Sequence, residues 1–303
     1  MLRHLRLQRL VPALACALAL AFVPGASAQQ GKAAVPKISA AEALYGDSAQ
    51  VELMQKQIDA LAPQKKGVTD IYVIGLAGWA TQDVFSHELA GALAATGKAL
   101  PLDGGIIRLI NSKETIKTLP LASRQNFASA VRGIGGIMDK EEDVLFLFMT
   151  SHGNQTTFAL QLPTVLVGLT PREVAKVLDE EGIKNRIVIV SACYSGIFVK
   201  PLANKNTVVI TAADDKSTSF GCADGRDWTY FGDALFHHSL KPGVDLKTVF
   251  AKTRSVIAGW EKSQHIKPSN PQGYFGDELM RKLAPLIKAK AKAKGKAIEK
   301  ASQ

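Results

Sequence analysis

The stretches LFLFMTSHGNQ (145–155) and IVIVSACYSGIF (187–198) each begin as a continuous apolar run and end abruptly in small and polar residues. Such a run is typical of a strand that is buried on both faces of a parallel sheet. The first run leads to His152 and the second leads to Cys193. Because function in such sheets collects beyond the carboxyl ends of the strands, we expect the imidazole and the thiol to lie at the same edge.

The rest of the chain alternates strand patterns with helix patterns. Apolar runs predict further strands at 71–76, 106–111 and 206–213. Helical spacing predicts helices at 40–61, from 84 onward, at 121–138, after Thr170 with Pro171 as first residue, and at 246–264. This order implies an α/β fold with one mostly parallel sheet between two layers of helices, with no internal repeat and no second domain.

Residues 1–28 have the three parts of a secretory signal peptide. Three arginines precede an apolar run at 10–22, and Ala26-Ser27-Ala28 is a small-x-small cleavage signal. An uncleaved membrane anchor is the alternative, but the apolar run is short for a bilayer. We therefore expect an exported protein, periplasmic or extracellular, with no transmembrane span once the signal is removed.

The net charge of +10 is concentrated at the two ends of the chain. Three arginines lie in the first nine residues, and residues 281–303 carry eight basic residues against one acidic residue. The remaining body is formally neutral, which argues against a nucleic-acid-binding domain. The Lys/Ala-rich end predicts a solvated, partly helical tail. The alternative is that this tail makes weak contact with anionic surfaces.

The residues around His152 and Cys193 suit acyl transfer. Gly153 leaves its backbone N–H open to a ligand, so an imidazole that handles protons stands beside an amide that can stabilise an oxyanion. Cys193 can supply a thiolate nucleophile and a second N–H. Alternatives remain for each cysteine: Cys193 could be a packing residue, and Cys193 and Cys222 could form a structural disulfide in an oxidising compartment. A serine hydrolase is excluded because the Gly-x-Ser-x-Gly elbow is missing.

The pair of motifs resembles legumain-like (asparaginyl endopeptidase) cysteine peptidases, which share the caspase-like fold. Those proteins have His-Gly after one strand and Ala-Cys-x-Ser-Gly after the next, as at 152–153 and 192–196. The likeness continues through TAADDKSTSFGCADGRDWTYFGDALF (211–236) and covers roughly 68–240. The resemblance implies a caspase-like α/β/α fold and a thiol endopeptidase with a His152–Cys193 dyad that needs no metal and no cofactor.

The resemblance also implies a specificity pocket lined by Thr218, Ser219 and Asp233. At the position of Ser191 the family has an acidic residue, and near Asp83 it has an Arg-His pair. Because an aspartate favours a cation or an amide donor, we expect a pocket that includes Asp83, together with Ser191, to accept a basic or amide-bearing residue. The plainer alternatives are that Asp83, with its neighbour, caps a helix and that Asp233 is a solvated carboxylate.

These observations predict four segments: a signal peptide (1–28), a linker with a leading helix (29–66), a peptidase domain (67–280) and a basic tail (281–303). The predicted activity is cleavage of peptide or protein substrates through a thioester acyl-enzyme. Transpeptidation is a related outcome, because an amine can take the thioester in place of water. The alternative function is a catalytically inactive caspase-like binding protein whose basic tail contacts anionic envelope surfaces.

Overall fold

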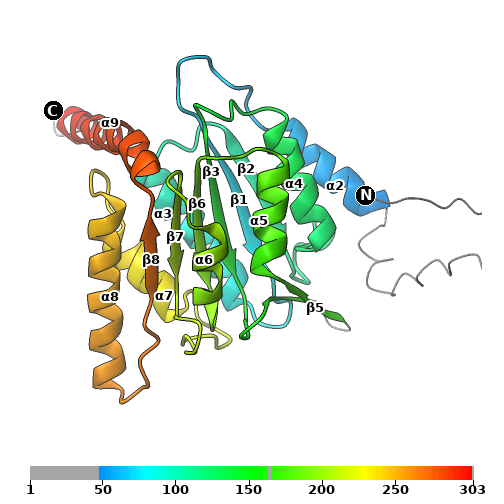
Figure 1. Ribbon diagram of the computed structural model, residues 1–303, viewed down its shortest axis with the longest axis vertical. Coiled ribbons are helices and arrows are strands. Elements are labelled where there is room, and N and C mark those ends of the chain that lie inside the picture. The colour runs from blue at the N-terminus through cyan, green and yellow to red at the C-terminus, as the bar shows by residue number, and fades with distance from the viewer. Residues whose placement is uncertain (1–47, 163–164, 302–303) are drawn as a thin grey trace, which may run out of the picture. The chain divides into compact units, whose positions relative to one another are not determined.

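The central feature of the fold is a six-stranded sheet with the order β2-β1-β3-β6-β7-β8 (Figure 1). The computed structural model describes residues 48–162 and 165–301, so the predicted signal peptide lies outside the described residues. All neighbouring strands pair in parallel except β8, which is antiparallel to β7. The mostly parallel sheet that the sequence predicts is therefore confirmed.

The strands of the sheet are β1 (Ile71–Ala77), β2 (Gly105–Ile110), β3 (Val144–Thr150), β6 (Arg186–Ser191), β7 (Thr207–Thr211) and β8 (Gln272–Phe275). A separate antiparallel hairpin consists of β4 (Phe158–Leu162) and β5 (Val165–Leu169). The helices are α2 (Ser48–Asp59), α3 (Val84–Ala99), α4 (Arg124–Gly135), α5 (Pro171–Glu180), η1 (Ser195–Phe198), α6 (Val199–Leu202), α7 (Tyr230–Gly232), η2 (Asp233–Ser239), α8 (Leu246–Ser263) and α9 (Asp277–Ala301).

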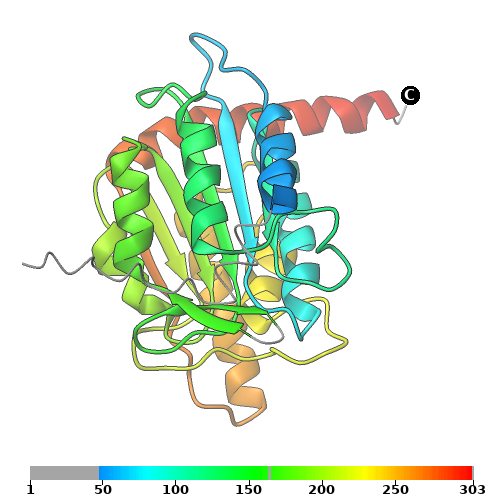
Figure 2. The ribbon, with the colours of Figure 1, turned by 90° about the vertical axis from the view of Figure 1, so that its right-hand side faces the viewer.

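The sheet has a hydrophobic core on each face, because side chains alternate along every strand. In β1, Ile71 and Val73 belong to the core under α3, η2, α8 and α9, whereas Tyr72 and Ile74 belong to the core under α2, α4, α5 and α6. Figures 1 and 2 show the resulting three layers. This arrangement explains why the strands read as unbroken apolar runs, and it confirms the α/β/α architecture.

Three short strands were not expected from the sequence. Strands β4, β5 and β8 have four or five residues each, and their burial is partial. Such segments lack the long apolar run that identifies the central strands.

None of the helices among the described residues is long and apolar enough to cross a bilayer.

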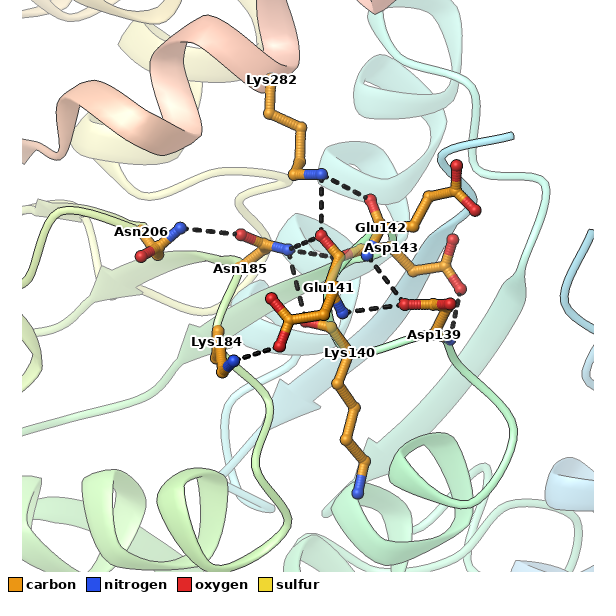
Figure 3. A network of polar contacts seen from close by, with 9 residues as sticks. All are labelled: Asp139, Lys140, Glu141, Glu142, Asp143, Lys184, Asn185, Asn206 and Lys282. Atoms are coloured by element: carbon orange, nitrogen blue, oxygen red, sulfur yellow. Dashed lines mark hydrogen bonds and ion pairs between the residues drawn. The ribbon is translucent and has the colours of Figure 1, made fainter. Parts of the chain in front are cut away.

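A network of polar contacts at the amino ends of the strands ties α9 to the sheet (Figure 3). The buried Asn185 donates to the carbonyl oxygens of Glu141 and Asp143, at 3.1 Å each, and accepts from Asn206 at 3.1 Å. The Lys282 ammonium donates to the carbonyl oxygen of Glu141 at 2.9 Å. These contacts join the segments before β3, β6 and β7 to one another and to α9.

The buried core extends beyond both ends of the predicted peptidase domain. Met54 of α2 is buried against the sheet, so this part of the predicted linker packs on the domain. Leu283 and Ile287 of α9 are buried as well, although the predicted tail begins at residue 281. These two positions follow Leu279 at intervals of four residues and form one apolar helical face. The boundary predicted at residue 280 does not mark the end of the core.

Candidate active site

The parallel register of β3 and β6 brings together the segments that carry His152 and Cys193. Thr150 is opposite Ser191, and the N–H of Ser151 donates to the carbonyl of Ser191 at 3.1 Å. Both strands end at the carboxyl edge of the sheet. His152 follows the last residue of β3 by two positions, and Cys193 follows the last residue of β6 by two positions. A side chain at Gly153 would place its Cβ 2.4 Å from the carbonyl oxygen of Cys193. The glycine is therefore required for the close approach of the two loops.

The imidazole of His152 is held in one orientation by its surroundings. Its Nε2 lies 2.5 Å from Oε1 of Gln82, while the Gln82 amide nitrogen donates to the carbonyl of Cys222 at 2.8 Å. Because that carbonyl can only accept, the amide oxygen must face the ring, and Nε2 must carry a proton. The rings of Trp79 and Phe85 pack edge-on against the imidazole at 4.5 and 5.1 Å.

This tautomer leaves Nδ1 of His152 as the nitrogen that can accept a proton. Burial lowers the pKa of His152, because removal from water disfavours the charged ring. The imidazole is therefore neutral at neutral pH and can act as a base.

Cys193 stands on a strained turn. The next residue, Tyr194, has a φ of 56°, in the left-handed region that non-glycine residues rarely adopt. The turn is held by the N–H of Tyr194, which donates to the carbonyl of Ser217 at 2.8 Å. The sulfur of Cys193 is half-buried and accepts a hydrogen bond from the N–H of Ser219 at 3.3 Å.

Both cysteines among the described residues are free. Burial raises the pKa of Cys222 to about 12, with smaller contributions from Cys193 and Glu88. Cys222 is therefore a poor nucleophile at neutral pH.

The backbone around the dyad leaves two amide donors available. The N–H groups of Gly153 and Cys193 donate no hydrogen bond to any residue in the described part of the chain. The neighbouring backbone is nevertheless fixed, because the carbonyl of His152 accepts from Ala159 at 2.9 Å. Two fixed, unused donors beside a thiol suit an oxyanion hole.

A buried glutamate lies directly below this edge. Glu88 of α3 accepts from Thr229 at 2.6 Å and from Ser191 at 3.3 Å, and it also binds the hydroxyl of Thr150. Burial raises the pKa of Glu88 to about 7, although the three hydroxyl groups oppose this by stabilising the carboxylate. Gly232 is required here, since a Cβ at that position would meet the carboxylate at 1.8 Å.

The predicted pocket residues lie in different settings in the structure. Ser219 contacts the sulfur of Cys193, and Ser191 lies below it as a partner of Glu88. Thr218 is in the same loop and is exposed. Asp83 is exposed and accepts from the N–H of Gly225 at 3.2 Å.

The place of Asp233 in the specificity pocket stays a prediction, and its observed contacts are ion pairs. Among the described residues, its carboxylate pairs with His237 and His238. Asp83 occupies the N-cap position of α3, as the alternative reading of the sequence has it, but its side chain makes no capping hydrogen bond.

A comparison with protein families matches residues 95–281 to the peptidase C13 family. The match spans more than half of the chain and includes both His152 and Cys193. The chain belongs to the peptidase C13 family. It is therefore a cysteine-type endopeptidase, and the resemblance to legumain-like peptidases is confirmed.

Solved structures that resemble this C13 peptidase include caspases. A crystal structure of caspase-1 from Spodoptera frugiperda is 11% identical, covers 71% of this chain and 90% of its own, and has a TM-score of 0.47. A pro-sf-caspase-1 structure is 12% identical, with coverage of 71% and 95% and a TM-score of 0.46. No curated protein matches the chain.

Replacing Gln82 tests how the imidazole is positioned. In Gln82→Leu, Nε2 of His152 loses its acceptor, and we expect kcat to fall roughly 10- to 100-fold with little change in KM. In Gln82→Glu, the carboxylate should raise the pKa of His152 and move the acidic limb of the kcat/KM profile to higher pH. Steady-state kinetics between pH 4 and 9 measures both effects. An unchanged pH profile in Gln82→Glu would contradict the contact.

Replacing Glu88 tests the buried carboxyl group. The pKa of Glu88 is about 7 in the folded chain, against an ordinary 4.5. Between pH 4.5 and pH 7 the folded state therefore binds more protons than the unfolded state. Stability should therefore fall as pH rises through this window, by roughly 3 kcal/mol in total. Glu88→Gln cannot ionise, so its stability relative to the wild type should increase with pH in urea unfolding at pH 5 to 8. The exposed Glu52→Gln is the control, and a pH-independent difference for Glu88→Gln would refute the shift.

Proposed function

We propose that this C13 peptidase is an exported endopeptidase that cleaves peptide bonds through a Cys193 thioester, with His152 as its base and acid. The observation that carries this proposal is the register of β3 and β6, which delivers both residues to one edge beside two unused amide donors. Export is supported by the signal-peptide pattern of residues 1–28. Contact of the lysine-rich end of α9 with anionic surfaces stays a prediction.

The reaction follows from these positions. The sulfur of Cys193 attacks the carbonyl carbon of the peptide bond, and its proton passes to Nδ1 of His152. The N–H groups of Gly153 and Cys193 stabilise the oxyanion of the tetrahedral intermediate. His152 then protonates the leaving amine, and the C–N bond breaks to leave a thioester.

The thioester is resolved by a second nucleophile. Water, losing a proton to His152, attacks the thioester carbon, and the release of the Cys193 sulfur gives a carboxylic acid. When the amine of another peptide attacks instead, a new peptide bond forms. Transpeptidation therefore needs no additional group in the site, only an amine that competes with water.

Two clefts, one lined by His152 and the other by its partner Gln82, bear on substrate choice. One, of about 330 Å³, is lined by His152, Trp79 and apolar residues of the hairpin that include Leu166. The other, of about 230 Å³, contains Gln82 and the charged groups Asp83, Lys113, Glu114 and Asp224. With three carboxylates against one ammonium, this second cleft supports a preference for a basic or amide-bearing residue before the scissile bond.

A fluorogenic peptide panel that varies the residue before the scissile bond tests the activity and this preference. We expect kcat/KM for Arg, Lys, Asn and Gln to exceed that for Asp by at least about tenfold, since like charges repel. Asp83→Asn should reduce the advantage of Arg and Lys more than that of Asn and Gln. Cys193→Ser is the inactive control. Equal turnover of all peptides would refute the preference, and equal activity in Cys193→Ser would refute the mechanism.

A further inference from the structure

Two adjacent histidines and an aspartate converge on one face of η2. The carboxylate oxygen Oδ1 of Asp233 lies 2.9 Å from Nδ1 of His237 and 3.5 Å from Nε2 of His238. One ligand atom from each residue lies within 4.8 Å of the other two. The peptidase mechanism uses none of these side chains.

The π-helical form of η2 is what places all three side chains together. In an α-helix, residues i and i+4 share a face, but residue i+5 is rotated by roughly 140° from residue i about the helix axis. Here the N–H of Leu240 donates to the carbonyl of Leu235 at 2.8 Å, which is the i to i+5 bond of a π turn. The wider turn brings both His237 and His238 next to Asp233. π turns are rare in proteins, and those that do occur are often found at functional sites.

The two separations from Asp233 match those of ligands that share one metal ion, and the two histidine nitrogens lie within 4.8 Å of each other. Ligand nitrogens and oxygens about 2.0–2.2 Å from Zn²⁺ are separated from each other by roughly 2.9–3.5 Å in tetrahedral or octahedral geometry. Both measured separations from Asp233 fall in this range. Two imidazoles and one carboxylate are donors that suit Zn²⁺ and its first-row neighbours.

The surroundings fix one histidine and leave the cluster open to solvent. The ring of Trp260 packs edge-on against His238 at 5.5 Å, and Tyr230 also packs edge-on with Trp260, at 5.7 Å. The side chains of His237 and His238 are 66% and 46% exposed, so an ion could reach them. The ammonium of Lys241 donates a hydrogen bond to the backbone carbonyl oxygen of His237 at 3.0 Å.

We propose that Asp233, His237 and His238 form a Zn²⁺-binding site on η2, separate from the Cys193–His152 dyad. The three side chains supply three ligands, and water completes the coordination on the exposed side. This assigns to Asp233 a role other than the specificity pocket that the family resemblance implies for it. The proposal does not depend on the peptidase mechanism.

Calorimetric titration of ZnCl₂ into the protein tests the site. Cys193→Ala serves as the background, because the catalytic thiol and imidazole could themselves bind zinc. We expect one Zn²⁺ per chain in this background and at least tenfold weaker binding once His237→Ala and His238→Ala are added. His87→Ala is the matched control, since His87 faces Asp227 at 3.6 Å as a lone histidine–aspartate pair. That change should leave the affinity unaltered.

Fluorescence locates the ion. Cu²⁺ as a probe should quench Trp260, which contacts His238, and the quenching should disappear in Trp260→Phe and in the double histidine variant. Circular dichroism verifies that each variant is folded. Absence of stoichiometric zinc binding in the Cys193→Ala protein, or equal affinity in the double histidine variant, would overturn the proposal.

Discussion

Strands β3 and β6 run parallel with Thr150 opposite Ser191, and the geometry of the active site depends on that register. A slip of one residue would exchange the two faces of a strand and move its loop away from the partner loop. Glu88 links the ends of the two strands, because it accepts hydrogen bonds from the last residue of each strand and from Thr229. Helix α3 therefore joins both strand ends directly below the dyad.

Burial at this edge favours neutral forms of both an acid and a base. It raises the pKa of Glu88 and lowers the pKa of His152, because the charged form of each is poorly solvated. For His152 the result is an imidazole ready to take a proton. For Glu88 it is a carboxyl group that loses its proton near neutrality, so the support beneath the dyad is expected to weaken as pH rises.

The sequence predicted the central strands, because they follow from local patterns, and the same patterns place His152 and Cys193 after neighbouring strands. Continuous apolar runs identify buried parallel strands, and residues two positions beyond neighbouring strand ends lie at the same edge of the sheet. Gln82 could not be found in this way, since it contacts His152 across 70 positions of sequence. Glu88 did leave a signal: it interrupts the apolar face of α3 between Val84 and Ala92, and a lone acid on a buried face needs polar partners.

The central claim is that His152 activates Cys193, and selective alkylation tests it most directly. The mature protein would be treated with iodoacetamide at pH 7, and the labelling of Cys193 and Cys222 followed by peptide mass spectrometry. Cys222, whose pKa is raised to about 12, should react slowly. The account predicts labelling of Cys193 at least about tenfold faster than that of Cys222, and a slower rate at Cys193 in His152→Ala. Equal rates at the two thiols, or no effect of His152→Ala, would contradict it.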